Sequence, residues 1–132
     1  MIQNILLVDD EPDFSQGLAR LIAAGFPEAT VHTAKDGQEA LALLEREPVT
    51  LMLTDLRMPG LGGQELLRQA LDEYPQLTVI VLTGYGSVES AVAALKAGAY
   101  DFLTKPIVKE ELFRLPSLSF AMRMNGLSDR WK

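Results

Sequence analysis

The sequence contains no cysteine, which excludes disulfide bonds, thiolate catalysis and zinc sites with cysteine ligands. It has no run of about 18 apolar residues, so no membrane-spanning helix is predicted. The start lacks a basic leader and acids cut the first apolar run short, so we expect no signal peptide and a cytoplasmic location. Positive charge is scarce as well. The net charge of −6 argues against direct nucleic-acid binding by this chain, which would require a basic face.

The material for a folded domain is present. The chain has 132 residues, a length that suggests one compact domain. Of these residues 48% are hydrophobic and 23% are charged, which is ordinary for a globular protein with a hydrophobic core.

Short apolar runs alternate along the chain with stretches of helical period. The runs that read as strands are 4–8, 29–33, 49–54, 77–82 and 99–103. Helix signals lie between them: Pro12 suits a first helical turn, Asp36 and Glu39 have capping-box spacing, and Gly98 suits a helix end. The strands are apolar throughout rather than alternating, which is typical of a parallel sheet buried on both faces. The pattern predicts an α/β fold, a doubly wound five-stranded parallel sheet with helices on both faces.

The end of the chain departs from this pattern. Residues 112–132 contain four basic residues and one acid, a formal charge of +3. Pro116 falls where a closing helix should be in mid-course, so a helix that begins near Lys109 would break there. We therefore expect one domain over residues 1–115. Residues 116–132 would be a basic tail, an altered final helix or a linker stub, and the sequence leaves open whether they pack down, pair with another chain or fray.

Polar residues follow four of the predicted strands at their C-terminal ends. They are Asp9, Asp10 and Glu11 after the first strand, Asp55 after the third, Thr83 after the fourth and Lys105 after the fifth. In a doubly wound sheet, ligands bind in the crevice outside those ends, so these side chains should converge. Clustered carboxylates without a nearby histidine or cysteine suit a hard cation that prefers oxygen ligands, and Mg²⁺ fits best.

A pocket of this composition could carry out phosphoryl transfer. Mg²⁺ held by one or two carboxylates often shares its coordination shell with a phosphate. A carboxylate can also act as the nucleophile toward phosphorus and form an aspartyl phosphate. A lysine and a hydroxyl aimed at the phosphoryl oxygens would supply the remaining stabilisation of charge.

Four motifs in the chain resemble those of the receiver domains of two-component response regulators. They are VDDEP at 8–12, LTDLRMPG at 53–60, LTGYGS at 82–87 and GAYDFLTKP at 98–106. Their order and spacing match the family over roughly residues 3–112. The last two motifs look most like receivers attached to ATPase and DNA-binding output domains of the nitrogen-regulator type. The resemblance implies the flavodoxin-like receiver fold, with strand order 2-1-3-4-5.

The resemblance also implies a role for each site residue. Asp55 would be the phospho-acceptor. Asp10 would hold Mg²⁺ directly and Asp9 through water, and the backbone carbonyl of Arg57 would complete the protein ligands. Lys105 would contact the phosphoryl group, ahead of a cis peptide bond to proline. Two further residues would form the switch: Thr83 would move to the phosphoryl oxygen, and Phe102, often tyrosine in the family, would turn inward in response.

The partners implied by the resemblance are a sensor histidine kinase and a downstream output domain or protein. The chain would catalyse its own phosphotransfer and a slow autodephosphorylation, rather than act as a metabolic enzyme. Its phosphorylated form would change a surface for partner binding or homodimerisation. The sequence does not identify the kinase, the output or the oligomeric state.

Each motif also has a plainer interpretation. The three acids at 9–11 could cap a helix N-terminus, where the helix dipole favours negative charge. Asp55 and Thr83 could each simply begin a turn. The glycines at 60–63 lack the third glycine of a nucleotide-binding loop, so a plain turn is the better interpretation. Glu11 reads as a solvated residue rather than a ligand.

Two other functions compete with the switch. A Mg²⁺ phosphohydrolase with an aspartyl-phosphate intermediate typically has a second acid two residues after its nucleophile, and that position is Arg57 here. The other candidate is a phosphorylation-independent protein-interaction module, to which the altered tail could contribute a surface.

Overall fold

The computed structural model describes residues 3–58, 60–84 and 88–115 of the 132-residue chain. Its ten elements alternate strand and helix throughout. They are β1 (Gln3–Val8), α1 (Pro12–Gly25), β2 (Ala29–Ala34), α2 (Gly37–Arg46), β3 (Val49–Asp55), α3 (Gly63–Glu73), β4 (Thr78–Thr83), α4 (Val88–Lys96), β5 (Asp101–Thr104) and α5 (Lys109–Arg114). The strands form one sheet in the order β2-β1-β3-β4-β5, and every pair is parallel. The predicted fold class and strand order are confirmed.

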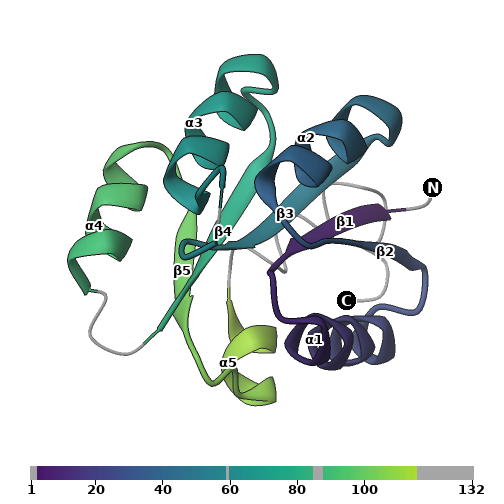
Figure 1. Ribbon diagram of the computed structural model, residues 1–132. Coiled ribbons are helices and arrows are strands. Elements are labelled where there is room, and N and C mark those ends of the chain that lie inside the picture. Colours follow the sequence, from purple (N-terminus) through teal and green to yellow (C-terminus); the bar gives the residue numbers. More distant parts are fainter. Residues whose placement is uncertain (1–2, 59, 85–87, 116–132) are drawn as a thin grey trace.

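The sheet separates two layers of helices, as Figure 1 shows: α1 and α5 lie on one face, and α2, α3 and α4 on the other. Alternate residues of each strand serve the two faces. Along β1, Ile5 and Leu7 belong to the core under α1 and α5, whereas Leu6 and Val8 belong to the core under the other helices. Because both faces are covered, the middle positions of the central strands are apolar and buried, at 5–8, 51–53 and 79–82.

Local signals in the sequence set several of the element ends. Asp36 caps α2 by accepting a hydrogen bond from the backbone N–H of Glu39 at 2.8 Å. Gly98 lies two residues after the end of α4, and its φ of +116° is a conformation that favours glycine. The strand predicted at 99–103 is found at Asp101–Thr104. Just before this strand, the N–H of Tyr100 donates to the carbonyl oxygen of Val79 on β4 at 2.8 Å.

Gly63, the first residue of α3, allows this helix to begin directly against the end of β3. A Cβ at this position would lie 2.3 Å from the backbone oxygen of Asp55. Glycine therefore lets the β3–α3 connection fold tightly around the C-terminal end of β3, where Asp55 lies. The neighbouring Gly60 has a different backbone role, because its φ of +74° is a conformation that favours glycine.

Among the described residues, no helix is long and apolar enough to cross a membrane. The helix predicted to begin near Lys109 is α5, which ends at Arg114. Pro116 and the predicted segment 116–132 lie outside the described residues.

Candidate functional site: an ionic pocket at the carboxyl edge of the sheet

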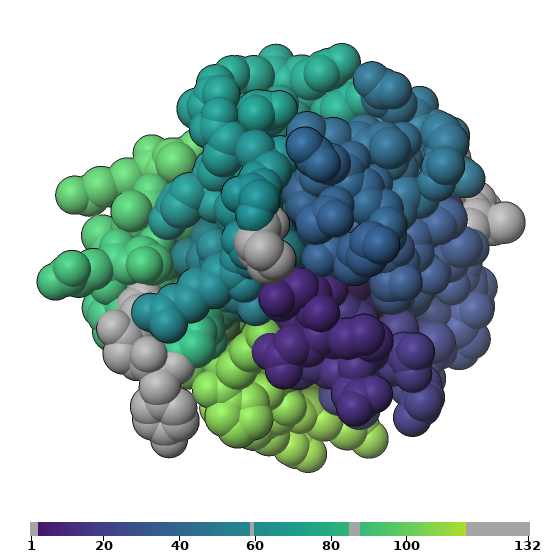
Figure 2. Space-filling view, viewed as in Figure 1, coloured from purple at the N-terminus to yellow at the C-terminus, as the bar shows by residue number. Residues whose placement is uncertain are grey.

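The sequence-predicted polar residues gather at the carboxyl edge of the sheet. Asp9 follows β1, Asp55 and Thr83 are the last residues of β3 and β4, and Lys105 follows β5. Figure 2 views this region, where the purple start of α1 meets the segments that follow β3 and β5. Since all five strands are parallel, residues far apart in the sequence reach one place.

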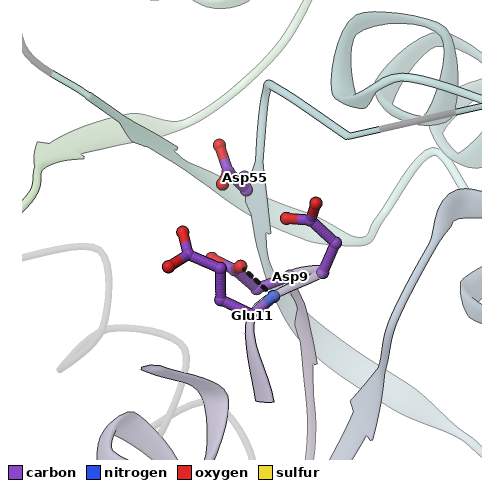
Figure 3. A group of neighbouring side chains, drawn as sticks. Asp9, Glu11 and Asp55 are labelled. Carbon is purple, nitrogen blue, oxygen red and sulfur yellow. Dashed lines mark hydrogen bonds between the residues drawn. The ribbon is translucent and has the colours of Figure 1, made fainter. Parts of the chain in front are cut away.

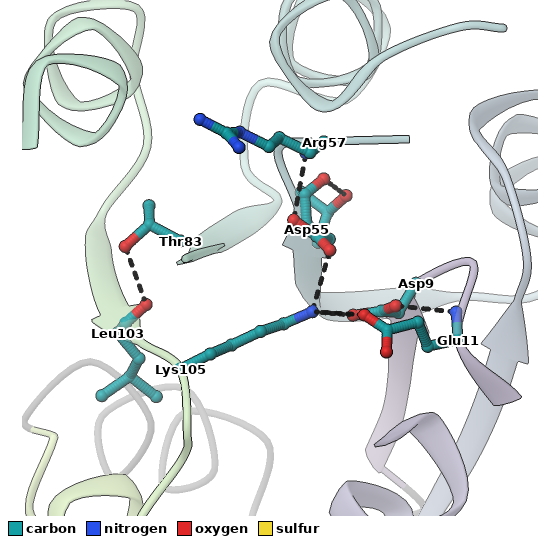
Figure 4. A network of polar contacts seen from close by, with 8 residues as sticks. Asp9, Glu11, Asp55, Arg57, Thr83, Leu103 and Lys105 are labelled. Carbon is teal, nitrogen blue, oxygen red and sulfur yellow. Dashed lines mark hydrogen bonds and ion pairs between the residues drawn. The ribbon is translucent and has the colours of Figure 1, made fainter. Parts of the chain in front are cut away.

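Lys105 is the cation at the centre of this pocket (Figure 4). Its ammonium nitrogen lies 2.7 Å from Oδ2 of Asp9 and 2.9 Å from Oδ2 of Asp55. The carboxylate of Glu11 is farther away, with Oε1 at 3.7 Å. One lysine therefore links the ends of β1 and β3 to the end of β5. The peptide bond from Lys105 to Pro106 is cis.

Backbone N–H groups orient the two buried carboxylates. Oδ1 of Asp9 accepts from the N–H of Glu11 at 2.9 Å, and Oδ1 of Asp55 accepts from the N–H of Arg57 at 3.0 Å. In each aspartate, one carboxylate oxygen accepts a hydrogen bond from the backbone N–H two residues later in the chain, and the other oxygen accepts from Lys105. The bond from Asp9 to the N–H of Glu11 is a turn just before α1, and the N-cap residue Glu11 makes no side-chain cap hydrogen bond, so the capping interpretation does not account for these acids.

Burial and hydrogen bonding act in opposite directions on the pKa of Asp9 and on that of Lys105. Burial raises the pKa of Asp9, although hydrogen bonds from Lys105 and from the backbone of Glu11 act in the opposite direction. Burial alone would lower the pKa of Lys105, but hydrogen bonds to Asp55 and Asp9 outweigh it and raise that pKa. Lys105 therefore stays charged, while negative charge on Asp9 is costly without a nearby cation.

The acids also form a group that could hold a metal ion. Asp9, Asp10, Glu11 and Asp55 each offer a carboxylate oxygen, and these four oxygens lie within 4.8 Å of one another. Figure 3 shows the carboxylates of Asp9, Glu11 and Asp55 grouped beyond the ends of β1 and β3. Asp9 and Asp55 are buried, whereas Asp10 and Glu11 are exposed. An all-oxygen set of this size suits Mg²⁺, so the donor chemistry fits the predicted ion.

The two predicted switch residues lie on neighbouring strands. Thr83 is buried, and its hydroxyl donates to the carbonyl oxygen of Leu103 at 3.4 Å (Figure 4). The preceding residue on β5, Phe102, is 38% exposed. The structure therefore joins the Thr83 hydroxyl to the strand that carries Phe102.

Sequence reasoning missed one neighbour of the pocket. The ring of Phe14 lies 4.2 Å, centroid to nitrogen, from the Lys105 ammonium. In the sequence, Phe14 is one member of the apolar stripe of the first helix, together with Leu18 and Leu21. No local pattern links it to a lysine 91 positions away.

Known proteins share both the sequence and the fold of the chain. The family described as the response regulator receiver domain matches residues 5–115. The response regulator protein PilR of Pseudomonas aeruginosa is 41% identical over 121 residues, which cover 92% of this chain and 27% of PilR. The transcriptional regulatory protein GlrR of Escherichia coli is 37% identical over 130 residues, which cover 98% of this chain and 29% of GlrR. The chain thus spans less than a third of the length of these relatives.

Solved structures agree with these matches. A receiver domain protein from Clostridium thermocellum superposes with a TM-score of 0.84 at 30% identity, covering 95% of this chain and 98% of that one. The receiver domain of NtrX from Brucella abortus gives a TM-score of 0.83 at 32% identity, covering 90% of this chain and 98% of that one. The chain therefore belongs to the response regulator receiver domain family of two-component signalling.

Proposed function

We propose that the chain is a phosphorylation-activated switch in which Asp55 accepts a phosphoryl group from a sensor histidine kinase. The observation that carries the proposal is the position of Lys105, whose ammonium lies within 3 Å of carboxylate oxygens from two other strand ends. A buried carboxylate held beside a lysine and further acids is an arrangement suited to phosphoryl transfer.

The reaction requires one carboxylate oxygen of Asp55 as the nucleophile. This oxygen forms a bond to phosphorus while the bond between phosphorus and the donor histidine nitrogen breaks. The electron pair of the broken bond stays on that nitrogen, which then takes up a proton. The N–H of Arg57 holds the other oxygen of Asp55 and so fixes the direction of the attacking one.

The residues that would hold Mg²⁺ are Asp9, Asp10 and Asp55, with the backbone carbonyl of Arg57. When bound, the ion would neutralise negative charge on the carboxylates and on the phosphoryl oxygens. Lys105 would move from the carboxylate of Asp55 to a phosphoryl oxygen, and its charge would stabilise the transferring group.

Thr83 would then carry the signal away from the pocket. Its hydroxyl now bonds to the carbonyl of Leu103 on β5. A phosphoryl oxygen on Asp55 would compete for that hydroxyl, release this bond and favour the inward position of Phe102. The phosphoryl group would thereby shift an equilibrium between two conformations of the β4–β5 region.

An apolar surface over α4 and β5 is suited to receive this change. Its large exposed apolar side chains are Val88, Val92, Leu95, Tyr100 and Phe102. The output would be a phosphorylation-dependent homodimer, or contact with a downstream domain or protein, through this surface. Two relatives, GlrR and the Pseudomonas aeruginosa regulator DctD, are transcriptional regulatory proteins by name. We propose that residues 1–115 are the receiver domain and that 116–132 are a basic C-terminal tail, an altered final helix or a linker stub.

The same surface favours a second candidate, an interaction module that does not depend on phosphate. The apolar side chains over α4 and β5 are exposed without any phosphoryl group. A constitutive dimer that buries them would need no chemistry at Asp55. The two candidates predict opposite results in one experiment.

That experiment is incubation with Mg²⁺ and acetyl phosphate or beryllofluoride, followed by intact mass and sedimentation velocity. The switch predicts a Mg²⁺-dependent phosphoryl adduct that is labile in base and absent from Asp55→Asn, together with a change in oligomer size. The switch would be contradicted by a folded protein that binds Mg²⁺ but forms no phosphoryl adduct and shows no change in sedimentation with beryllofluoride. Concentration-dependent dimerisation that is equal in the wild type and Asp55→Asn would support the constitutive module.

A further inference from the structure

The ammonium of Lys105 has an aromatic neighbour with no part in the mechanism above. The Phe14 ring centroid lies 4.2 Å from this nitrogen, within the distance of about 6 Å at which a cation is attracted to a ring face. Phe14 belongs to the first turn of α1 and lines a groove beside Lys105, Pro106 and Ile107. The aromatic ring thus faces the pocket from a different element than the aspartates.

The ring adds a contact of a different kind from the carboxylates. A lysine ammonium has three N–H donors. Two have hydrogen-bond partners in Asp9 and Asp55, at 2.7 and 2.9 Å, and Glu11 at 3.7 Å is beyond hydrogen-bond distance. Phe14 supplies an uncharged attraction to the same nitrogen.

The charges of the carboxylate partners change during the proposed reaction, whereas the electron distribution of the Phe14 ring stays the same. Phosphorylation converts the carboxylate of Asp55 to an acyl phosphate, and Asp9 would turn to the metal ion. The attraction of the Phe14 ring for a cation is the same in each of these states. A contact that persists in this way could keep the ammonium within reach of the phosphoryl group.

We infer that Phe14 is a positioning residue for phosphoryl transfer: its ring holds the Lys105 ammonium beside Asp55 before and after the phosphoryl group arrives. The inference rests on the proposed phosphorylation of Asp55. The competing explanation is packing alone, because Phe14 also packs against the core under α1 and α5. An experiment must therefore change the ring's electrons without changing its shape.

The experiment measures the rate of Asp55 phosphorylation by acetyl phosphate in Mg²⁺ for the full chain. At position 14 we would compare phenylalanine with mono-, di- and trifluorophenylalanine, which weaken the negative ring face stepwise at nearly constant volume. Phe14→Leu removes the ring face, and Phe14→Trp retains it. Phe113, whose ring packs edge-on to Phe26 away from the pocket, receives the same fluorinated series as a matched control.

The inference predicts a rate that falls with each added fluorine at position 14 and is unchanged by fluorine at position 113. Phe14→Leu should be about threefold to tenfold slower, and Phe14→Trp close to the wild type. In a Lys105→Met background, Phe14→Leu should have no further effect. A flat fluorine series, or an equal loss with and without Lys105, would overturn the inference while leaving the switch intact. Absence of any adduct on the wild type would instead contradict the proposed function.

Discussion

Two ionic clusters among the described residues each join one cation to two or more acids, but they differ in burial and in how far apart their residues lie in the sequence. Lys105 contacts Asp9 and Asp55, brought together from separate strand ends, and their side chains are only 17%, 2% and 9% exposed. Arg68 contacts Glu65 and Asp72 within the single helix α3, with side-chain exposures of 57%, 43% and 72%. The first cluster depends on the whole fold, and the second requires only one helix.

In Asp9, burial outweighs the effect of the cation on the pKa of the acid. Hydrogen bonds from Arg68 and then Gln69 lower the pKa of the exposed Glu65 to about 2. Asp9 is also hydrogen-bonded to a cation, yet burial raises its pKa above the ordinary value. Removing the Asp9 carboxylate from water raises its pKa more than the contact with Lys105 lowers it, so this buried charge is poorly explained as a stabilising device. This imbalance is the physical reason for assigning chemistry to one cluster and local helix stability to the other.

The largest difference is expected in phosphorylation. Lys105→Met should slow transfer from acetyl phosphate to Asp55 by about 100-fold or more, because it removes a positive charge aimed at the transferring group. The Arg68→Met variant should be phosphorylated on Asp55 at the wild-type rate. Quantifying the adduct by intact mass over time would check both rates. Equal rates in the two variants would remove the functional distinction between the clusters.

Stability should distinguish the clusters next. Without metal, Lys105→Met leaves two buried carboxylates without their cation and should lower the free energy of unfolding by about 3 kcal/mol. Mg²⁺ should restore part of this loss, because it can neutralise the same acids. Arg68→Met should shift the urea midpoint little, and Mg²⁺ should not affect the shift. Urea unfolding in EDTA and in Mg²⁺ measures all four values, and a Lys105→Met loss that Mg²⁺ leaves unchanged would contradict the shared site.

The sequence was sufficient to predict the fold and which residues lie at the carboxyl edge. Continuous apolar strands require a sheet covered on both faces, and parallel strands bring Asp9, Asp55, Thr83 and Lys105 to one edge whatever their side-chain conformations. The contacts within the pocket could not be predicted in the same way. The bond from Thr83 to Leu103 and the ring of Phe14 beside Lys105 depend on side-chain rotamers and on packing between distant elements, which no spacing in the sequence encodes.

The smallest expected effects concern pH, where the clusters should have opposite signs. The folded pKa of Glu65 is about 2, below the value of 4.5 of a free glutamate. Its contribution to stability is therefore present above pH 4.5 and is lost as the pH falls toward 2. The pKa of Asp9 is raised above 3.8, so its contribution is present below pH 3.8 and is lost as the pH rises through the folded value.

Unfolding free energies of the wild type, Glu65→Gln and Asp9→Asn, measured in EDTA from pH 2 to pH 7, would resolve the two signs. The advantage of the wild type over Glu65→Gln should grow with pH between 2 and 4.5, and its advantage over Asp9→Asn should shrink above pH 3.8. Salt should diminish the Glu65 difference, because this carboxylate is exposed, and should change the Asp9 difference less, because that one is buried. Two differences with the same sign would mean that burial does not outweigh the contact of Lys105 with Asp9.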